Sequence, residues 1–214
     1  MKKDIANPEI AIQLLDLQRL LFLTDGVFAI TITLLVLDLK LPAGPRQDLP
    51  LSLLGILPRF LVYLFAFVTI ANQWIFNHRI FRNVRHADGR LVLLTFGYLL
   101  FVTLIPFTAS LIGGYPAAPL AAACFSVNIL FLCLAAWAIW SHLGQAPHLL
   151  SESAASSALW QTARVWLYVA SGFVLAIPLG YASVYLAFAI WLIWPISGVW
   201  VMRRASPSRG SAKA

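Results

Sequence analysis

The sequence predicts an all-α, polytopic membrane protein with six transmembrane helices. The first observation is composition: 61% of the 214 residues are hydrophobic and only 11% are charged. A soluble domain carries about 25% charged residues, which it needs to cover its surface in water. The second observation is a set of six apolar runs, each close to the roughly 20 residues that span a bilayer. The third is the aromatic content, with 8 Trp and 14 Phe, because aromatic residues concentrate at membrane interfaces.

The six apolar runs follow one another with short connections, at residues 20–41, 52–76, 91–112, 119–140, 162–181 and 183–202. The first run contains Asp25 near its start, with Asp38 and Lys40 near its end, and the second has Arg59 near its start. Residues 1–203 are therefore predicted to form a single six-helix transmembrane domain. Residues 204–214 are small and polar, and are predicted to be a disordered cytoplasmic tail.

The distribution of basic residues predicts the orientation. Residues 42–51, residues 113–118 and the turn near Gly180 lie on one side of the predicted membrane, and the other loops and both termini lie on the opposite side. Of the 15 Lys and Arg residues, 12 lie on that opposite side. The positive-inside rule therefore places both termini in the cytoplasm. Residues 4–18 have apolar residues at near-helical spacing, which predicts either an interfacial helix or an extension of the first helix.

Several function classes are excluded by what the chain lacks. The net charge of +7 is explained by the orientation bias, and no soluble segment is large enough to form a basic nucleic-acid-binding domain. No Ser–His–Asp set, metal-ligand spacing or glycine-rich phosphate loop occurs, so the chain is predicted to be no enzyme and to hold no cofactor or tightly bound metal. The cysteines are predicted to be small apolar residues without a disulfide, and three histidines to be ordinary loop residues: Cys124, Cys133, His86, His142 and His148.

One polar sequence interrupts the first apolar run, from Arg19 to Gly26. Arg19 and Asp25 are six residues apart, so they do not form the usual three- or four-residue helical pair. Asp25 is therefore expected to find a partner on another helix or another subunit. An ionisable residue inside a membrane is costly and indicates function, although a position of Asp25 at interface depth would reduce that cost.

A stripe of small, branched and hydroxyl-bearing residues follows in the same run. Its members are spaced by three or four positions and share one helical face: Gly26, Ile30, Thr33, Leu37 and Leu41. Ordinary helix packing through small residues explains such a stripe as well as a special surface does. The residues alone leave both interpretations open.

The run from Arg19 to Leu41 resembles the first helix of the transmembrane protein 175 family, potassium channels of endosomes and lysosomes with prokaryotic relatives. The family signature is Arg, three residues, then Phe-Ser-Asp-Gly. Here Arg19, Asp25 and Gly26 are in place, Leu23 stands for Phe, and Thr24 stands for Ser and keeps the hydroxyl. A second block resembles the second and third helices of prokaryotic members: residues 74–81 (WIFNHRIF), Asp88 and residues 104–107 (LIPF).

The resemblance implies a homotetramer in a bacterial or archaeal cell membrane, since the signature occurs once and six helices are predicted. The first helices of the subunits would line a central pore through which potassium ions pass transiently, and the pore residues would be Ile30, Thr33, Leu34 and Leu37. A hydrophobic constriction of this kind can gate by dewetting. The chain has no Thr-Val-Gly-Tyr-Gly sequence, so no carbonyl-type selectivity filter and only a modest potassium preference are expected. Asp38 near one mouth would favour cations, partly offset by Lys40 and Arg46.

The resemblance also implies a structural polar network beside the pore helix, made of Arg19, Thr24, Asp25, Trp74, Asn77 and His78. His78 is in addition a candidate proton sensor, because the unperturbed pKa of histidine lies near 6.5. The alternative function is a secondary transporter or proton-coupled carrier with Asp25 as the coupling carboxylate, against which stands the absence of an internal sequence repeat. An intramembrane enzyme is a third possibility, which the lack of a nucleophile–base pair disfavours.

Overall fold

The computed structural model describes residues 8–40, 49–151 and 156–205, and the side chains of residues 17–40, 50–151 and 163–195. Within these ranges the regular structure is helical apart from one isolated bridge between Val84 and Leu150. The all-α prediction is therefore confirmed. The elements are α1 (Pro8–Leu34), the 3-10 helix η2 (Leu35–Asp38), α2 (Leu49–Gly55), α3 (Leu57–Phe81), α4 (Gly89–Thr103), α5 (Ile105–Gly114), α6 (Pro119–Gln145), the 3-10 helix η3 (Pro147–Leu149), α7 (Ser156–Ala182) and α8 (Val184–Ala205).

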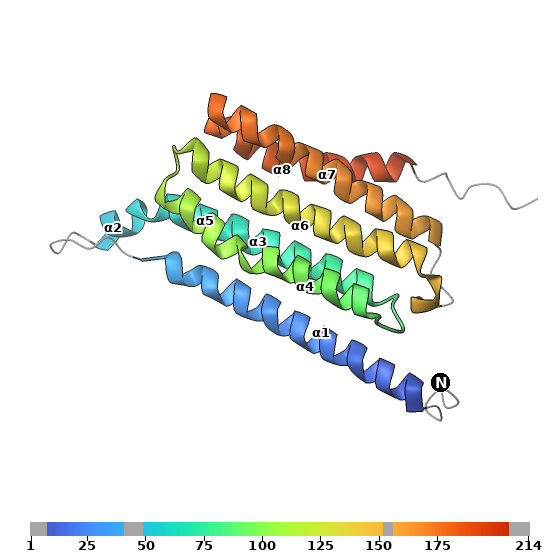
Figure 1. Ribbon diagram of the computed structural model, residues 1–214. Coiled ribbons are helices and arrows are strands. Elements are labelled where there is room, and N and C mark those ends of the chain that lie inside the picture. The colour runs from blue at the N-terminus through green and yellow to red at the C-terminus, as the bar shows by residue number, and fades with distance from the viewer. Residues whose placement is uncertain (1–7, 41–48, 152–155, 206–214) are drawn as a thin grey trace, which may run out of the picture.

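The long helices lie side by side along a common direction (Figure 1). The helix α1 lies at one edge against α3, α4 and α5, α6 lies in the middle, and the α7–α8 hairpin lies at the opposite edge. The start of α1 and the end of α8 lie at the same end of the bundle (Figure 1). At this end α3 finishes with His78 and Arg79 in its last turn, α4 begins after Asp88, and α7 begins. We call it the basic end.

Five helical segments of the described ranges are long and apolar enough to cross a membrane: Leu17–Asp38, Leu57–Phe81, Gly89–Gly114, Pro119–Gln145 and Ala163–Ala182. The sixth predicted run corresponds to α8, of which Val184–Pro195 counts as a shorter apolar helix over the residues searched. Six crossings, with both termini in the cytoplasm, therefore stay a prediction. Residues 206–214, which include most of the predicted tail, lie outside the described residues.

Several helix boundaries differ from the predicted ones, and the starts of the first two helices differ most instructively. The helix α1 begins at Pro8 and continues unbroken to Leu34, so the alternative in which residues 4–18 extend the first helix is confirmed from Pro8 onward. The second run was predicted to start at residue 52, but α3 starts at Leu57 after the separate helix α2. A proline in the first turn of α3 explains this start, because proline suits the first helical position and disrupts an interior one. Leu41 and residues 42–48 lie outside the description.

The third predicted run, residues 91–112, corresponds to one candidate membrane span, Gly89–Gly114, which is interrupted at a single residue. It is divided at Leu104 into α4 and α5. Pro106 has no N–H to donate to the carbonyl of Val102, one turn earlier, which is a sufficient cause of the break. The amide of Asn128 on α6 packs against it, donating to the carbonyl of Phe101 at 3.2 Å and to the hydroxyl of Thr108 at 3.4 Å.

Small residues allow the central and outer helices to approach closely. Buried alanines lie along α6, α7 and α8: Ala121, Ala122, Ala136, Ala163, Ala170, Ala176 and Ala187. Small side chains at helix contacts let backbones come together inside a membrane, where apolar burial gives no driving force of its own. Both cysteines are free, as predicted, with Cys133 buried and Cys124 half-buried.

Candidate functional site

The helix α1 buries one face against the rest of the chain. The buried residues recur every three or four positions: Leu17, Leu20, Thr24, Phe28, Thr31 and Leu35. This spacing marks a single helical face, and α1 turns it toward α3, α4 and α5. The packing of this face therefore decides which residues of α1 point away from the subunit.

The opposite face of α1, continued by η2, is left uncovered by the described helices, and we call it the open face. Ile30 is 61% exposed, Leu37 60% and Leu34 45%. Gly26 and Thr33 are exposed on the same side. The four residues expected to line a pore thus share the open face. In a single copy of the chain, no described helix packs against this face.

The signature carboxylate Asp25 has a partner on another helix. The indole Nε1 of Trp74 on α3 donates a hydrogen bond to Oδ1 of Asp25 at 2.9 Å. The Trp74 ring in turn stacks on His78, with ring centroids 5.7 Å apart and planes 25° apart. The structure therefore brings together three of the six expected network residues in a chain of two contacts that ties α1 to α3.

The other three expected network residues take no part in these contacts. The hydroxyl of Thr24 is buried and donates to the carbonyl of Leu20 on its own helix at 2.7 Å. Asn77 is buried, and its Oδ1 has no hydrogen-bond partner among the described residues. The side chain of Arg19 is exposed. That the six residues act as one network stays a prediction.

A second contact behind α1 was not anticipated from the sequence. The Tyr98 hydroxyl of α4 donates to Oε1 of Gln73 at 3.0 Å, and the Tyr98 ring lies 6.3 Å from that of Phe28. All three side chains are buried. The available signal was Gln73 itself, a polar residue in an apolar run directly before Trp74. This group supports the buried face of α1 one turn beyond Asp25.

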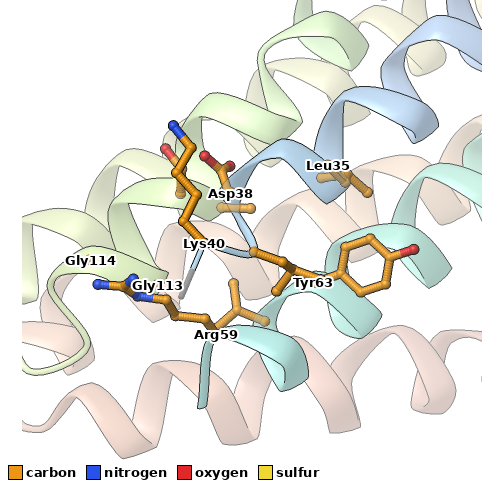
Figure 2. A pocket seen from close by; sticks show the side chains of 11 residues that line it. Leu35, Asp38, Lys40, Arg59, Tyr63, Gly113 and Gly114 are labelled. Carbon is orange, nitrogen blue, oxygen red and sulfur yellow. The ribbon is translucent and has the colours of Figure 1, made fainter. Parts of the chain in front are cut away.

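At the end of the bundle opposite the basic end, a pocket of about 260 Å³ with three charged side chains in its lining lies beside the end of α1. Figure 2 shows Asp38 and Lys40, which follow α1, beside Arg59 and Tyr63 of α3 and the glycines at the end of α5. The carboxylate of Asp38 therefore shares this pocket with two cationic side chains. In the described part of the chain no group of three or more His, Cys, Asp or Glu residues could hold a metal ion.

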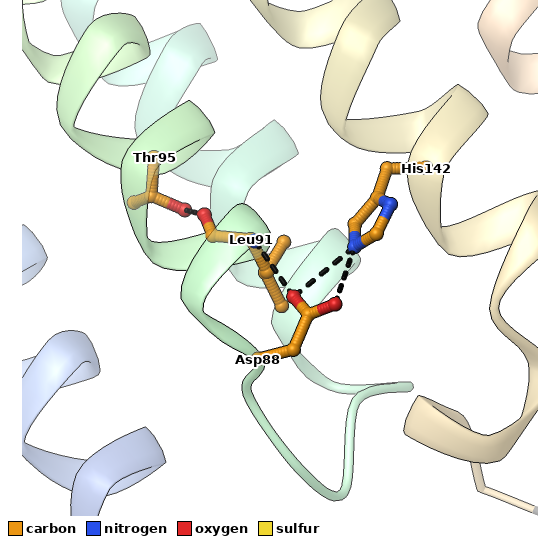
Figure 3. Close-up of polar contacts among 4 residues, drawn as sticks. All are labelled: Asp88, Leu91, Thr95 and His142. Carbon is orange, nitrogen blue, oxygen red and sulfur yellow. Dashed lines mark hydrogen bonds and ion pairs between the residues drawn. The ribbon is translucent and has the colours of Figure 1, made fainter.

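At the basic end a carboxylate–imidazole pair joins α4 to α6. His142 was predicted to be a loop residue, which was wrong: it lies in the last turn of α6, 2.9 Å from Oδ2 of Asp88. Asp88 also caps α4 by accepting the Leu91 N–H at 2.7 Å (Figure 3). Burial raises the pKa of Asp88, but the hydrogen bonds from Leu91 and His142 outweigh it and hold the pKa below its usual value of 3.8.

Comparison with known proteins places the chain among channels. The profile of the family described as endosomal/lysosomal potassium channel TMEM175 matches residues 19–106. A potassium channel of Chamaesiphon minutus is 30% identical over 179 residues, covering 81% of this chain and 88% of the relative. A potassium channel of Streptomyces collinus is 31% identical over 174 residues, covering 78% and 83%.

A more distant relative and a solved structure point to the same family. The human endosomal/lysosomal proton channel TMEM175 is 29% identical over 143 residues, covering 66% of this chain and 28% of the human protein. The crystal structure of a lysosomal potassium-selective channel TMEM175 homolog from Chamaesiphon minutus superposes with a TM-score of 0.73 at 26% identity, covering 87% of this chain and 98% of that one. These relatives are ion channels rather than enzymes. The protein is therefore a multi-pass membrane protein that belongs to the TMEM175 family.

Proposed function

We propose that the protein is a potassium-permeable channel, in which four copies of the chain place the open faces of their α1 helices around a central pore. The observation that carries this proposal is the uncovered aliphatic stripe of α1 and η2, in which Ile30 and Leu37 are exposed to nearly the same extent. The bacterial relatives are named potassium channels, which supports potassium as the permeant ion.

Contact with lipid alone explains the open face less well. Asp25 is exposed within the span that starts at Leu17, about 12 Å along the helix from that residue at 1.5 Å per residue. Ionisable side chains at such depth face a protein interior or a water-filled cavity. Asp25 is turned toward Trp74 on α3, whereas Gly26 and Thr33 lie on the open face. A water-filled pore shared by several copies would hydrate the Thr33 hydroxyl and the exposed side of Asp25, which lipid acyl chains cannot do.

The proposed pore narrows at rings of Ile30, Leu34 and Leu37. A hydrophobic constriction controls conduction by excluding water when it is narrow and admitting it when it widens. The helix α1 is continuous from Pro8 to Leu34, so its carbonyls are engaged in helical hydrogen bonds and form no cage for a dehydrated ion. Discrimination between potassium and sodium is accordingly modest. The Thr33 hydroxyl donates to Ile30 O at 2.8 Å and keeps lone pairs for a passing ion.

The contacts behind the pore helix would fix its rotation. The Trp74–Asp25 hydrogen bond and the Phe28–Tyr98 ring contact lie on adjacent turns of α1. A rotation of α1 that removed Ile30 from the pore axis would break both. In the proposed channel, Asp25 therefore positions the pore helix rather than carrying a transported proton.

Single-channel recording tests the proposal. The purified protein in planar bilayers under a potassium gradient is expected to give unitary currents that reverse near the potassium equilibrium potential. Ile30→Asn is expected to raise conductance and weaken selectivity, because a polar amide keeps the constriction hydrated. Ile193→Asn is the matched control, since Ile193 on α8 is 64% exposed, close to the 61% of Ile30. Slow, saturable, proton-dependent flux without unitary currents would instead establish a carrier, and equal behaviour of both variants would refute the pore assignment.

A further inference from the structure

A second, larger pocket lies away from α1, between α3, α6, α7 and α8. Its volume is about 400 Å³, and it extends along residues 65–76 of α3 and 165–173 of α7. All four helices contribute mainly apolar and aromatic side chains. Apolar pockets of this size with a few polar groups are typical binding sites for small molecules. Its residues on α3, α6 and α7 lie in segments long and apolar enough to span the membrane, and those on α8 lie in the apolar stretch Val184–Pro195. A ligand of this pocket would therefore come from the bilayer.

The two ends of this pocket differ in chemistry. Because α3 runs toward the basic end and α7 away from it, Phe76 and Trp166 lie nearer that end, with ring centroids 5.1 Å apart. Toward the middle of the bundle the pocket is closed by Phe65, Phe125 and Trp191, with Trp191 6.0 Å from Phe65 and 4.8 Å from Phe125. The pocket therefore has an aromatic floor at depth.

Its polar groups lie on α3 toward the basic end. Gln73 is 7% exposed, and its Oε1 already accepts from Tyr98. The neighbouring Asn72 is exposed, and no hydrogen bond joins its amide to any residue of the described ranges. An amide without a partner is costly in hydrocarbon. A ligand with an oxygen acceptor near Asn72 would remove that cost.

Two arginine side chains lie at the same end of the pocket. The Arg79 guanidinium lies over the ring of Phe76, 5.7 Å from its centroid, and Phe76 lines the pocket. Arg164 is exposed directly before Val165, another lining residue. The pocket thus runs from a cationic rim, past an amide, to an aromatic floor.

From this order of charges and polar groups we infer a lipid site: an anionic phospholipid of the leaflet at the basic end inserts one acyl chain into the pocket. The phosphate lies at Arg79, an ester oxygen accepts from the Asn72 amide, and the chain ends on the aromatic floor. Because lipid tails are as apolar as the pocket walls, the headgroup contacts decide which lipid binds.

Native mass spectrometry of the protein in mixed phosphatidylglycerol and phosphatidylcholine tests the site. Val169→Phe fills the pocket from α7 and is expected to abolish the retained lipid. Val174→Phe is the control, on the same helix, 50% exposed and outside the pocket. Arg79→Gln is expected to lower phosphatidylglycerol retention about fivefold, whereas Arg82→Gln, also exposed at this end, leaves it unchanged. If Val169→Phe does not fold, phosphatidylglycerol retention by Arg79→Gln decides the test.

Photocrosslinking identifies the occupant directly. Leu192 lines the pocket beside Trp191 and is 57% exposed, so a photoreactive benzoylphenylalanine at this position reports what occupies the pocket near its floor. An adduct with phospholipid supports the inference. An adduct with a second copy of the chain overturns it. Equal retention of the two lipids, or equal retention by the Val169→Phe and Val174→Phe variants, overturns it as well.

Discussion

The Nε1 of Trp74 donates to Oδ1 of Asp25 at 2.9 Å, which joins the signature carboxylate of α1 to α3. The two residues are 49 positions apart in the chain. Since the Trp74 ring also stacks on His78, one indole links the helix with the open face to the last turns of α3. This contact has a direct consequence for stability.

Replacing Trp74 with Phe removes the donor and keeps an aromatic ring beside His78. The thermal midpoint in detergent is expected to fall by an amount that corresponds to about 1 kcal/mol, within the range for a hydrogen bond between membrane helices. Trp137→Phe is the control, because Trp137 is 37% exposed, close to the 40% of Trp74, and lies on α6 rather than α3. Equal midpoints for the two variants would mean that the Asp25 contact does not stabilise the fold.

In the proposed channel, Asp38 raises the cation concentration at one mouth. Asp38→Asn is expected to reduce potassium conductance by roughly half at low salt and to leave it unchanged at 1 M, where the Debye length is about 3 Å. Lys40→Gln, in the same pocket, is expected to shift conductance the opposite way. Single-channel amplitudes at two potassium concentrations measure both, and a salt-independent loss would point to a structural effect instead.

The Asp88 pair makes stability depend on pH. Because the pKa of Asp88 is lowered in the folded state, its stabilisation is complete above the usual carboxyl pKa of about 3.9 and is lost as pH falls through the lower folded value. Asp88→Asn keeps an N-cap oxygen and loses the charge, so it is expected to flatten this acid dependence. Asp88→Ala also removes the cap and costs about 1 kcal/mol. Thermal midpoints between pH 2 and pH 7 separate the two variants.

Close packing in the α7–α8 hairpin depends on Gly172. A Cβ at this position would overlap the indole of Trp194, whose Nε1 donates to the carbonyl of Tyr168 at 2.8 Å. Gly172→Ala is expected to destabilise the protein by about 1–3 kcal/mol, the usual cost of overpacking. In Gly97→Ala the added Cβ has nothing within 4 Å, so this control is expected to be neutral or slightly stabilising. Thermal unfolding in detergent compares them.

Much of the fold follows from local properties of the chain. Runs of apolar residues predict helices in a bilayer because each backbone group must find its hydrogen bond within the segment, and five such segments occur in the described ranges. The break at Leu104 was not predicted, although Pro106 signalled it, since proline is often tolerated within membrane helices. His142 was placed in a loop because the hydropathy of its run fades before α6 ends.

For the candidate site, too, some features follow from the sequence and others depend on how the helices pack. Helical spacing alone places Gly26, Ile30 and Thr33 on one face of a helix, with Leu37 continuing that face in η2. The sequence could not decide whether that face is buried, since Phe28 and Ile30 are equally apolar and only packing against α3, α4 and α5 distinguishes them. The tertiary structure decided that Phe28 is 1% exposed and Ile30 is 61% exposed. It also decided that Asp25 meets Trp74, because a contact between distant positions depends on how two helices pack.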